Sequence, residues 1–158
     1  MITVTLDEGT QYTAQRLAQL RYQSNREAGV DNGRIGPQSD WQTDLDGIGA
    51  ELAFCQLTNL WPDLSIKPRK GGADCRSHRG KTIDVKTTRH SGGRLLATTD
   101  KQLEDADIYV LMVGSFPTYT WIGWATAEEL LNRKNITDLG YGPTYALEQS
   151  ALHAPVGD

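Results

Sequence analysis

Apolar positions in the first third of the chain recur at the spacing of helices. Between residues 10 and 28, strong helix formers surround a partial apolar stripe that ends before Gly29 and consists of Ala14, Leu17, Ala18 and Leu20. This spacing predicts a first helix. A second helix is predicted from residue 43 or 44, where Thr or Asp can cap it, to about residue 60 before a proline. Turn-forming residues between the two helices predict a loop.

Strand patterns follow in the middle of the chain. We predict short strands at residues 65–67, 73–77 and 82–87, a buried strand in the continuous apolar run 108–114, and an alternating strand at 119–124. Two Thr-x-x-Glu/Gln pairs predict short helices, one through residue 104 and one through residue 133. The order of helix, three strands, helix, two strands and helix predicts an α/β fold, with residues 1–158 as one domain.

Composition narrows the class of protein. The 158 residues are 38% hydrophobic, which is typical of a globular domain. The longest apolar run, 108–114, is too short to span a bilayer, and the start MITVTLDEGT resembles no export signal. Cys55 and Cys75 form no CxxC motif, so neither a disulfide framework nor a zinc ribbon is indicated. We therefore expect a cytoplasmic protein without a membrane partner.

Charge is distributed unevenly along the chain. The net charge is −4, yet the segment 67–94 holds nine of the sixteen Lys and Arg residues and two acids, so it is +7 and the remainder −11. A basic stripe in an acidic protein is either a solvated surface or the binding face for a phosphate backbone. The candidate nucleic-acid contacts in this stripe are Lys67, Arg69, Lys70, Arg76, Arg89, His90 and Arg94.

The stretch 73–87 predicts a hairpin that opposes two carboxylates. A three-residue loop ending in Gly80 is typical of a type I turn followed by a left-handed glycine. That register places Asp74 opposite Asp84, and strand alternation puts Asp84 and Lys86 on one face. Opposed like charges destabilise a sheet unless a cation lies between them. Two such carboxylates favour a divalent ion with hard oxygen ligands, Mg²⁺ or Mn²⁺.

A third acid lies in the predicted second helix. Glu51 has apolar residues at its helical neighbour positions, Ile48, Phe54 and Cys55. An ordinary surface glutamate rarely has such neighbours, although the polar edge of a half-exposed helix is the alternative interpretation.

The series GIGAE, then Asp74 before a turn, then Asp84-Val85-Lys86, resembles the PD-(D/E)XK nuclease superfamily. The resemblance covers about residues 44–113 and implies a restriction-endonuclease-like αβββαβ core, a mixed sheet flanked by helices, with an extra N-terminal helix and the core at about 44–134. Ala73 replaces the motif proline. Gln102 is placed like the glutamine of the RecB-type branch, but Ala106 stands where that branch has tyrosine.

The resemblance also implies a function. It implies a Mg²⁺- or Mn²⁺-dependent phosphodiesterase, a deoxyribonuclease, with Asp74, Asp84, Glu51 and the Val85 carbonyl around the metal and with Lys86 as the motif lysine. Lys86 either orients or deprotonates water or stabilises the charge of the reacting phosphate, and one or two metal ions are both compatible with the sequence. The partner is expected to be nucleic acid, DNA before RNA, and a homodimer is compatible with the fold. The alternative is a nuclease-fold module that binds DNA or inhibits a partner without cleavage.

Overall fold

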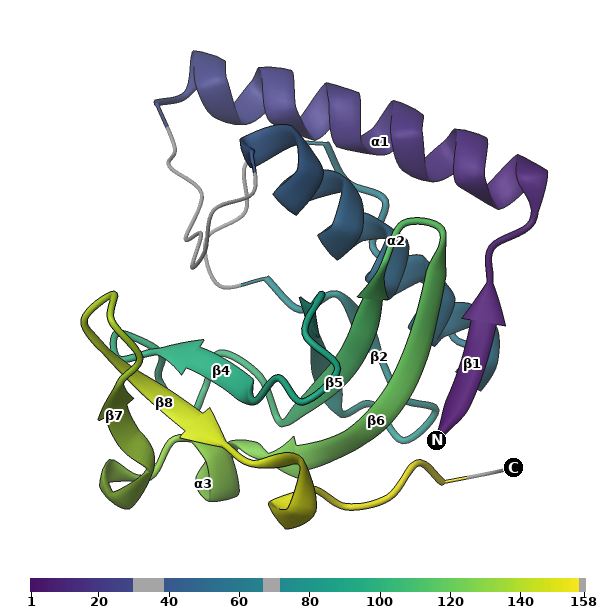
Figure 1. The fold of residues 1–158 in the computed structure, drawn as a ribbon. Helices are drawn as coiled ribbons and strands as arrows, with labels where there is room; N and C mark the ends of the chain where they lie inside the picture. The colour runs from purple at the N-terminus through teal and green to yellow at the C-terminus, as the bar shows by residue number, and fades with distance from the viewer. Residues whose placement is uncertain (30–38, 67–71, 157–158) are drawn as a thin grey trace.

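Two helices lie over one face of a five-stranded sheet, and a three-stranded sheet lies against part of its other face (Figure 1). The computed structural model describes residues 1–29, 39–66 and 72–156. In chain order, the elements are β1 (Ile2–Thr5), α1 (Glu8–Glu27), α2 (Asp40–Thr58), β2 (Cys75–Arg76), β3 (Thr82–Thr88), β4 (Leu95–Thr98), β5 (Ile108–Ser115), β6 (Thr118–Thr126), α3 (Ala127–Leu130), the 3-10 turn η1 (Arg133–Asn135), β7 (Ile136–Asp138), β8 (Pro143–Leu147) and the 3-10 turn η2 (Gln149–Ala151).

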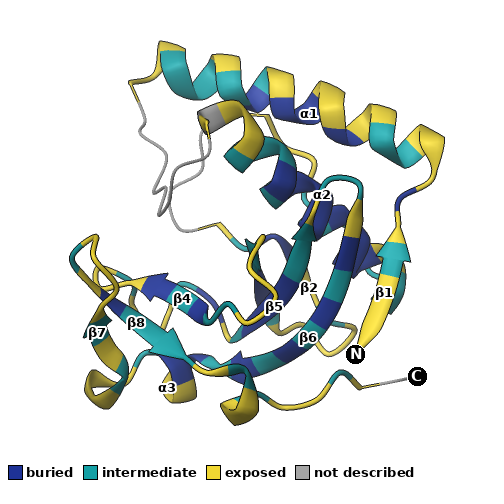
Figure 2. Cartoon of the chain, viewed as in Figure 1, coloured by how far each residue is buried: buried dark blue, intermediate teal, exposed yellow. Residues whose placement is uncertain are grey.

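Both long helices begin at capped residues. The Asp7 carboxylate accepts a hydrogen bond from the backbone N–H of Thr10 at the start of α1. Helix α2 begins at Asp40, earlier than predicted, because Ser39 and Gln42 form a reciprocal capping box upstream of the expected cap. The middle of α2, residues 46–55, is largely buried between α1 and the sheet (Figure 2).

The large sheet has the order β1-β6-β5-β3-β2, in which β3 and β5 run parallel and every other neighbouring pair is antiparallel. The β2–β3 hairpin has the predicted register, with Cys75 opposite Ile83 and Arg76 opposite Thr82. Gly80 has φ +82° and ends the predicted three-residue loop. These two predictions are confirmed, and they fix the frame in which Asp74 and Asp84 are placed.

The two faces of the sheet contribute to different cores. One core packs α1 and α2 against residues of β3, β5 and β6, including Val85 and Trp121. The other packs β4, α3 and the small sheet, of order β4-β8-β7, against Tyr109 and Leu111 of β5. Strand β5 is therefore covered on both sides, and β3 pairs with it over residues 83–88, which gives the polar residues of β3 a rigid support.

Several local predictions are wrong. Residues 99–104 form turns in place of a helix, Ser65 and Ile66 lie outside any strand, and α3 ends at Leu130. The strands β1, β4, β7 and β8 were not predicted. The Thr99 side chain does not cap a helix here, because the Gln102 N–H donates to the Asp105 carboxylate and the Asp105 N–H closes a turn on the Gln102 carbonyl.

The observed fold is α/β with a mixed sheet and flanking helices, in agreement with the predicted class. Within the described ranges, no helix has the length and apolar character needed to cross a membrane.

Candidate functional site

Three carboxylates and two lysines surround a pocket of about 240 Å³ beside the β2–β3 hairpin. Glu51 comes from α2, Asp74 directly precedes β2, and Asp84 belongs to β3. The remaining lining residues are Gly72, Val85, Lys86 and Lys101. The structure thus brings together the four residues that the sequence singled out for catalysis, and adds Lys101.

Asp74 is held in the sheet by backbone and side-chain contacts. Its N–H donates to the Ile83 carbonyl at 2.9 Å, and its Oδ2 accepts from the Val85 N–H at 2.7 Å. The residue is only 8% exposed. Burial, followed by the negative charges of Glu51 and Asp84, raises the pKa of Asp74 well above its usual range, and the hydrogen bond from Val85 opposes that rise. The carboxyl groups are therefore close enough to repel one another.

Asp84 carries one lysine on each carboxylate oxygen. Lys86 Nζ lies 2.9 Å from Oδ1, and Lys101 Nζ lies 3.5 Å from Oδ2. Burial alone would lower the pKa of Lys86, but the charge and hydrogen bond of Asp84, together with the other two carboxylates, raise it. These carboxylates keep Lys86 in its ammonium form.

Glu51 points from α2 into the same pocket and is oriented by a buried arginine. Arg21 of α1 places Nη1 3.4 Å from Glu51 Oε2. Its other nitrogens donate to the backbone carbonyls of Ser65 and Asp63, at 2.9 and 2.5 Å. Arg21 therefore fixes both the glutamate and the segment that leads toward Asp74, and Glu51 is not an ordinary surface residue.

The donor set fits a hard divalent cation in its chemistry. All candidate ligands are oxygens, from the two aspartates, Glu51 and the Val85 carbonyl. Burial and the nearby charges of Glu51 and Asp84 raise the pKa of Asp74, and a cation bound between these carboxylates would relieve their repulsion. Among the described residues, no group of three or more His, Cys, Asp and Glu side chains is arranged to hold a metal ion. The two aspartates with a backbone carbonyl are a smaller ligand set.

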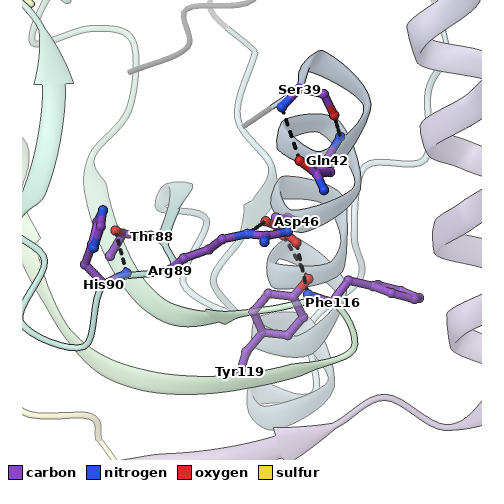
Figure 3. Close-up of polar contacts among 8 residues, drawn as sticks. All are labelled: Ser39, Gln42, Asp46, Thr88, Arg89, His90, Phe116 and Tyr119. Carbon is purple, nitrogen blue, oxygen red and sulfur yellow. Dashed lines mark hydrogen bonds and ion pairs between the residues drawn. The ribbon is translucent and has the colours of Figure 1, made fainter. Parts of the chain in front are cut away.

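A second polar centre lies near the start of α2 and fixes Arg89 (Figure 3). The Asp46 side chain is 3% exposed; its Oδ2 accepts from Arg89 Nε at 2.6 Å and its Oδ1 from the Phe116 N–H at 3.0 Å. The Tyr119 hydroxyl donates to the Asp46 carbonyl at 3.0 Å. Gly49 permits this approach, because a Cβ there would clash with the Tyr119 hydroxyl. Asp46 thus joins α2 to the end of β3 and to the β5–β6 turn.

None of the candidate nucleic-acid contacts among the described residues lines the pocket. Arg89 and His90 follow β3 and are exposed, and Arg94 pairs with Glu148 at 2.9 Å. Gln149 holds the 91–93 loop by donating to the carbonyls of Ser91 and Gly93. This basic loop is therefore anchored to η2. Arg76 is exposed on β2, whereas Lys67, Arg69 and Lys70 lie outside the described residues.

Sequence reasoning missed Arg21, Asp46 and Lys101. Arg21 occupies a position of α1 where the apolar stripe predicts another apolar residue. A charged residue at such a position indicates a buried ion pair, and this could have been recognised from the sequence. Gln102, singled out by the resemblance, is exposed and folds onto the Asp100 carbonyl, and the adjacent Lys101 enters the pocket instead. Asp46 carried no local signal, because its partners lie 43 and 70 residues away.

The arrangement concentrates acids and fixed cations where a phosphate oxygen and a divalent cation can meet. No protein-family model matches this chain, and no curated protein matches it in sequence. The interpretation of the site therefore depends on its own geometry and chemistry.

Proposed function

We propose that the chain is a metal-dependent nuclease with a restriction-endonuclease-like core, a member of the PD-(D/E)XK superfamily. The observation that carries the proposal is the convergence of Glu51, Asp74, Asp84 and Lys86 on one pocket. Three neighbouring carboxylates in a largely buried site cost stability, and Asp74 is held against that cost by a strand hydrogen bond. A cluster that opposes folding in this way is typical of a functional site.

Each residue has a role that its contacts support. Mg²⁺ or Mn²⁺ bound by Asp74, Asp84 and the Val85 carbonyl, with Glu51 completing the acidic set, supplies the Lewis acidity that phosphodiester hydrolysis needs. The Lys86 ammonium donates to a non-bridging phosphate oxygen and neutralises the charge that develops there. Arg21 keeps Glu51 directed into the pocket. The substrate is a nucleic acid, DNA in the first instance, because the 76–94 segment that supplies Asp84 and Lys86 to the pocket also carries exposed basic side chains.

Cleavage assays with matched variants test the proposal. Supercoiled plasmid, end-labelled duplex, single-stranded DNA and RNA are incubated with the protein in Mg²⁺, Mn²⁺ or EDTA. We expect metal-dependent cleavage that falls at least about a hundredfold in Asp84→Asn and in Lys86→Ala. Glu104→Gln and Lys134→Ala make similar changes at exposed residues outside the pocket and should cleave like the parent protein.

The outcomes separate the two functional interpretations. Absence of cleavage on every substrate, together with retained DNA binding, would replace the nuclease with a nuclease-fold binding module. Cleavage that survives Asp84→Asn at the parent rate would show that the activity resides elsewhere. Circular dichroism of each variant distinguishes a lost catalytic group from a lost fold.

A further inference from the structure

Lys101 is a charged residue of the pocket to which the proposed nuclease chemistry assigns no role. Its ammonium group lies 3.5 Å from Asp84 Oδ2, on the carboxylate oxygen that Lys86 leaves free, and its side chain is only 23% exposed. A long lysine side chain loses substantial rotamer entropy when it is buried in this way. Its position next to Asp84 is thus a specific feature of the site.

The backbone around Lys101 is fixed by consecutive turns. The Lys101 N–H donates to the Thr98 carbonyl at 3.1 Å, at the end of β4. The next turn is closed by the Asp105 N–H on the Gln102 carbonyl, and the Asp105 carboxylate accepts from the Gln102 N–H. Strand β4 pairs with β8, so the small sheet carries the turn that delivers this lysine. The ammonium group is therefore presented from a rigid support, as a resident cation.

The charges around the pocket determine how the Lys101 ammonium group affects metal binding. Within the described part of the chain, three cationic side chains accompany the pocket carboxylates Glu51, Asp74 and Asp84. Arg21 contacts Glu51, whereas Lys86 and Lys101 both contact Asp84. One divalent ion added to this balanced set gives a net charge of two, enough to attract a phosphodiester. A second divalent ion would have to bind against that charge, a few ångströms from a fixed ammonium group.

We propose that Lys101 supplies the positive charge that a second metal ion would otherwise bring to Asp84, so that the site takes up one divalent cation rather than two. This inference rests on the proposed function, and it resolves the number of metal ions that the sequence leaves open. Lys101 acts here through charge compensation at Asp84. Removing its charge should open the second position.

Mn²⁺ binding without nucleic acid tests the inference independently of cleavage. The free Mn²⁺ signal in electron paramagnetic resonance gives the stoichiometry, and low-temperature spectra detect two ions that are exchange-coupled. We expect one ion for the parent protein and two coupled ions for Lys101→Met, with the first ion bound on the order of tenfold more tightly because a nearby like charge is gone. Lys101→Gln repeats the neutralisation with a polar side chain in case the Met variant folds poorly.

Two controls isolate the charge at this position. Lys101→Arg keeps the cation and should bind one ion, and Lys134→Met removes an exposed lysine from η1 and should also bind one. A parent protein that binds two ions would overturn the inference and leave the nuclease proposal standing. The same holds if both neutral variants are folded and still bind one ion. A parent protein that binds no Mn²⁺ would overturn both proposals.

Discussion

Replacing Asp46 should destabilise the fold strongly, although Asp46 lies outside the catalytic pocket. Its carboxylate is almost completely buried and accepts hydrogen bonds from Arg89 and from the backbone of Phe116. Asp46→Ala removes both acceptors and leaves the Phe116 N–H without this partner. Because the partly buried Phe116 N–H loses its acceptor and part of its desolvation is then uncompensated, the loss exceeds that of a surface ion pair.

The magnitude follows from the two contacts. A hydrogen bond to a charged group contributes about 1.5–3 kcal/mol, and the share of Arg89 is reduced because its side chain is 42% exposed. We therefore expect Asp46→Ala to lower the free energy of unfolding by about 3 kcal/mol. Asp46→Asn, which keeps one carbonyl acceptor, should lose about half as much. Arg89→Ala should also cost about 2 kcal/mol or more, because it leaves a buried carboxylate without its cation.

Urea unfolding followed by tryptophan fluorescence measures these losses, since Trp121 is buried in the main core. The double variant should be about 1–2 kcal/mol more stable than the sum of the two single losses predicts, because the second replacement removes a partner already lost. Glu104→Ala, at an exposed carboxylate, should change stability by less than about 0.5 kcal/mol. An Asp46→Ala loss below about 1 kcal/mol, or additive single losses, would refute the reasoning.

Three further predictions concern the pocket, the helix above it and the basic segment. Asp74→Asn should stabilise the metal-free protein. Because the pKa of Asp74 is raised in the folded state, the stability of the parent protein falls as pH rises from the ordinary aspartate pKa through this raised value. The advantage of the variant in urea unfolding should therefore grow from acidic to neutral pH, and an advantage that shrinks would contradict the assignment. Gly49→Ala should cost more than about 2 kcal/mol in the same assay, since its Cβ would clash with the Tyr119 hydroxyl, and a neutral result would show that α2 can shift. Replacing Arg89 and Arg94 by Gln should flatten the slope of log K against log salt for duplex binding in Ca²⁺ by up to about two units. Replacing the two basic residues of η1, Arg133 and Lys134, by Gln should leave this slope unchanged. A slope that is unchanged when Arg89 and Arg94 are replaced would show that these arginines are solvated and do not contact phosphates.

Local signals were sufficient for the elements that carry the acids. These signals are the apolar stripe of α1, the apolar run of β5 and the glycine loop after β2. Each one depends on residues that are close together in the sequence, so it can be recognised from the sequence alone. Gly80 sets the length of the loop, and the loop length sets the hairpin register. A one-residue slip in this register would place Asp74 opposite Val85. The predicted grouping of the acids depended on that single turn.

Contacts between distant segments were not predictable in the same way. Strand β4 is short, and its partner β8 lies about fifty residues further along the chain, so neither sequence alone indicates the small sheet. The Thr99–Gln102 pair matches a capping box, yet the Asp105 side chain takes the Gln102 N–H and closes a turn instead. Lys101 was missed for this reason, since its place in the pocket depends on the small sheet.

The three cations that contact the pocket carboxylates come from separate parts of the fold. Arg21 comes from α1, Lys86 from β3 and Lys101 from the turn carried by β4. Removing Arg21 takes a cation from Glu51, and removing either lysine takes one of the two cations from Asp84, whereas neutralising Asp74 relieves repulsion. In metal-free buffer, replacing a cation should therefore destabilise the protein and Asp74→Asn should stabilise it. A site built for packing alone would show no such asymmetry, because loss of either sign of charge would then disrupt the same contacts.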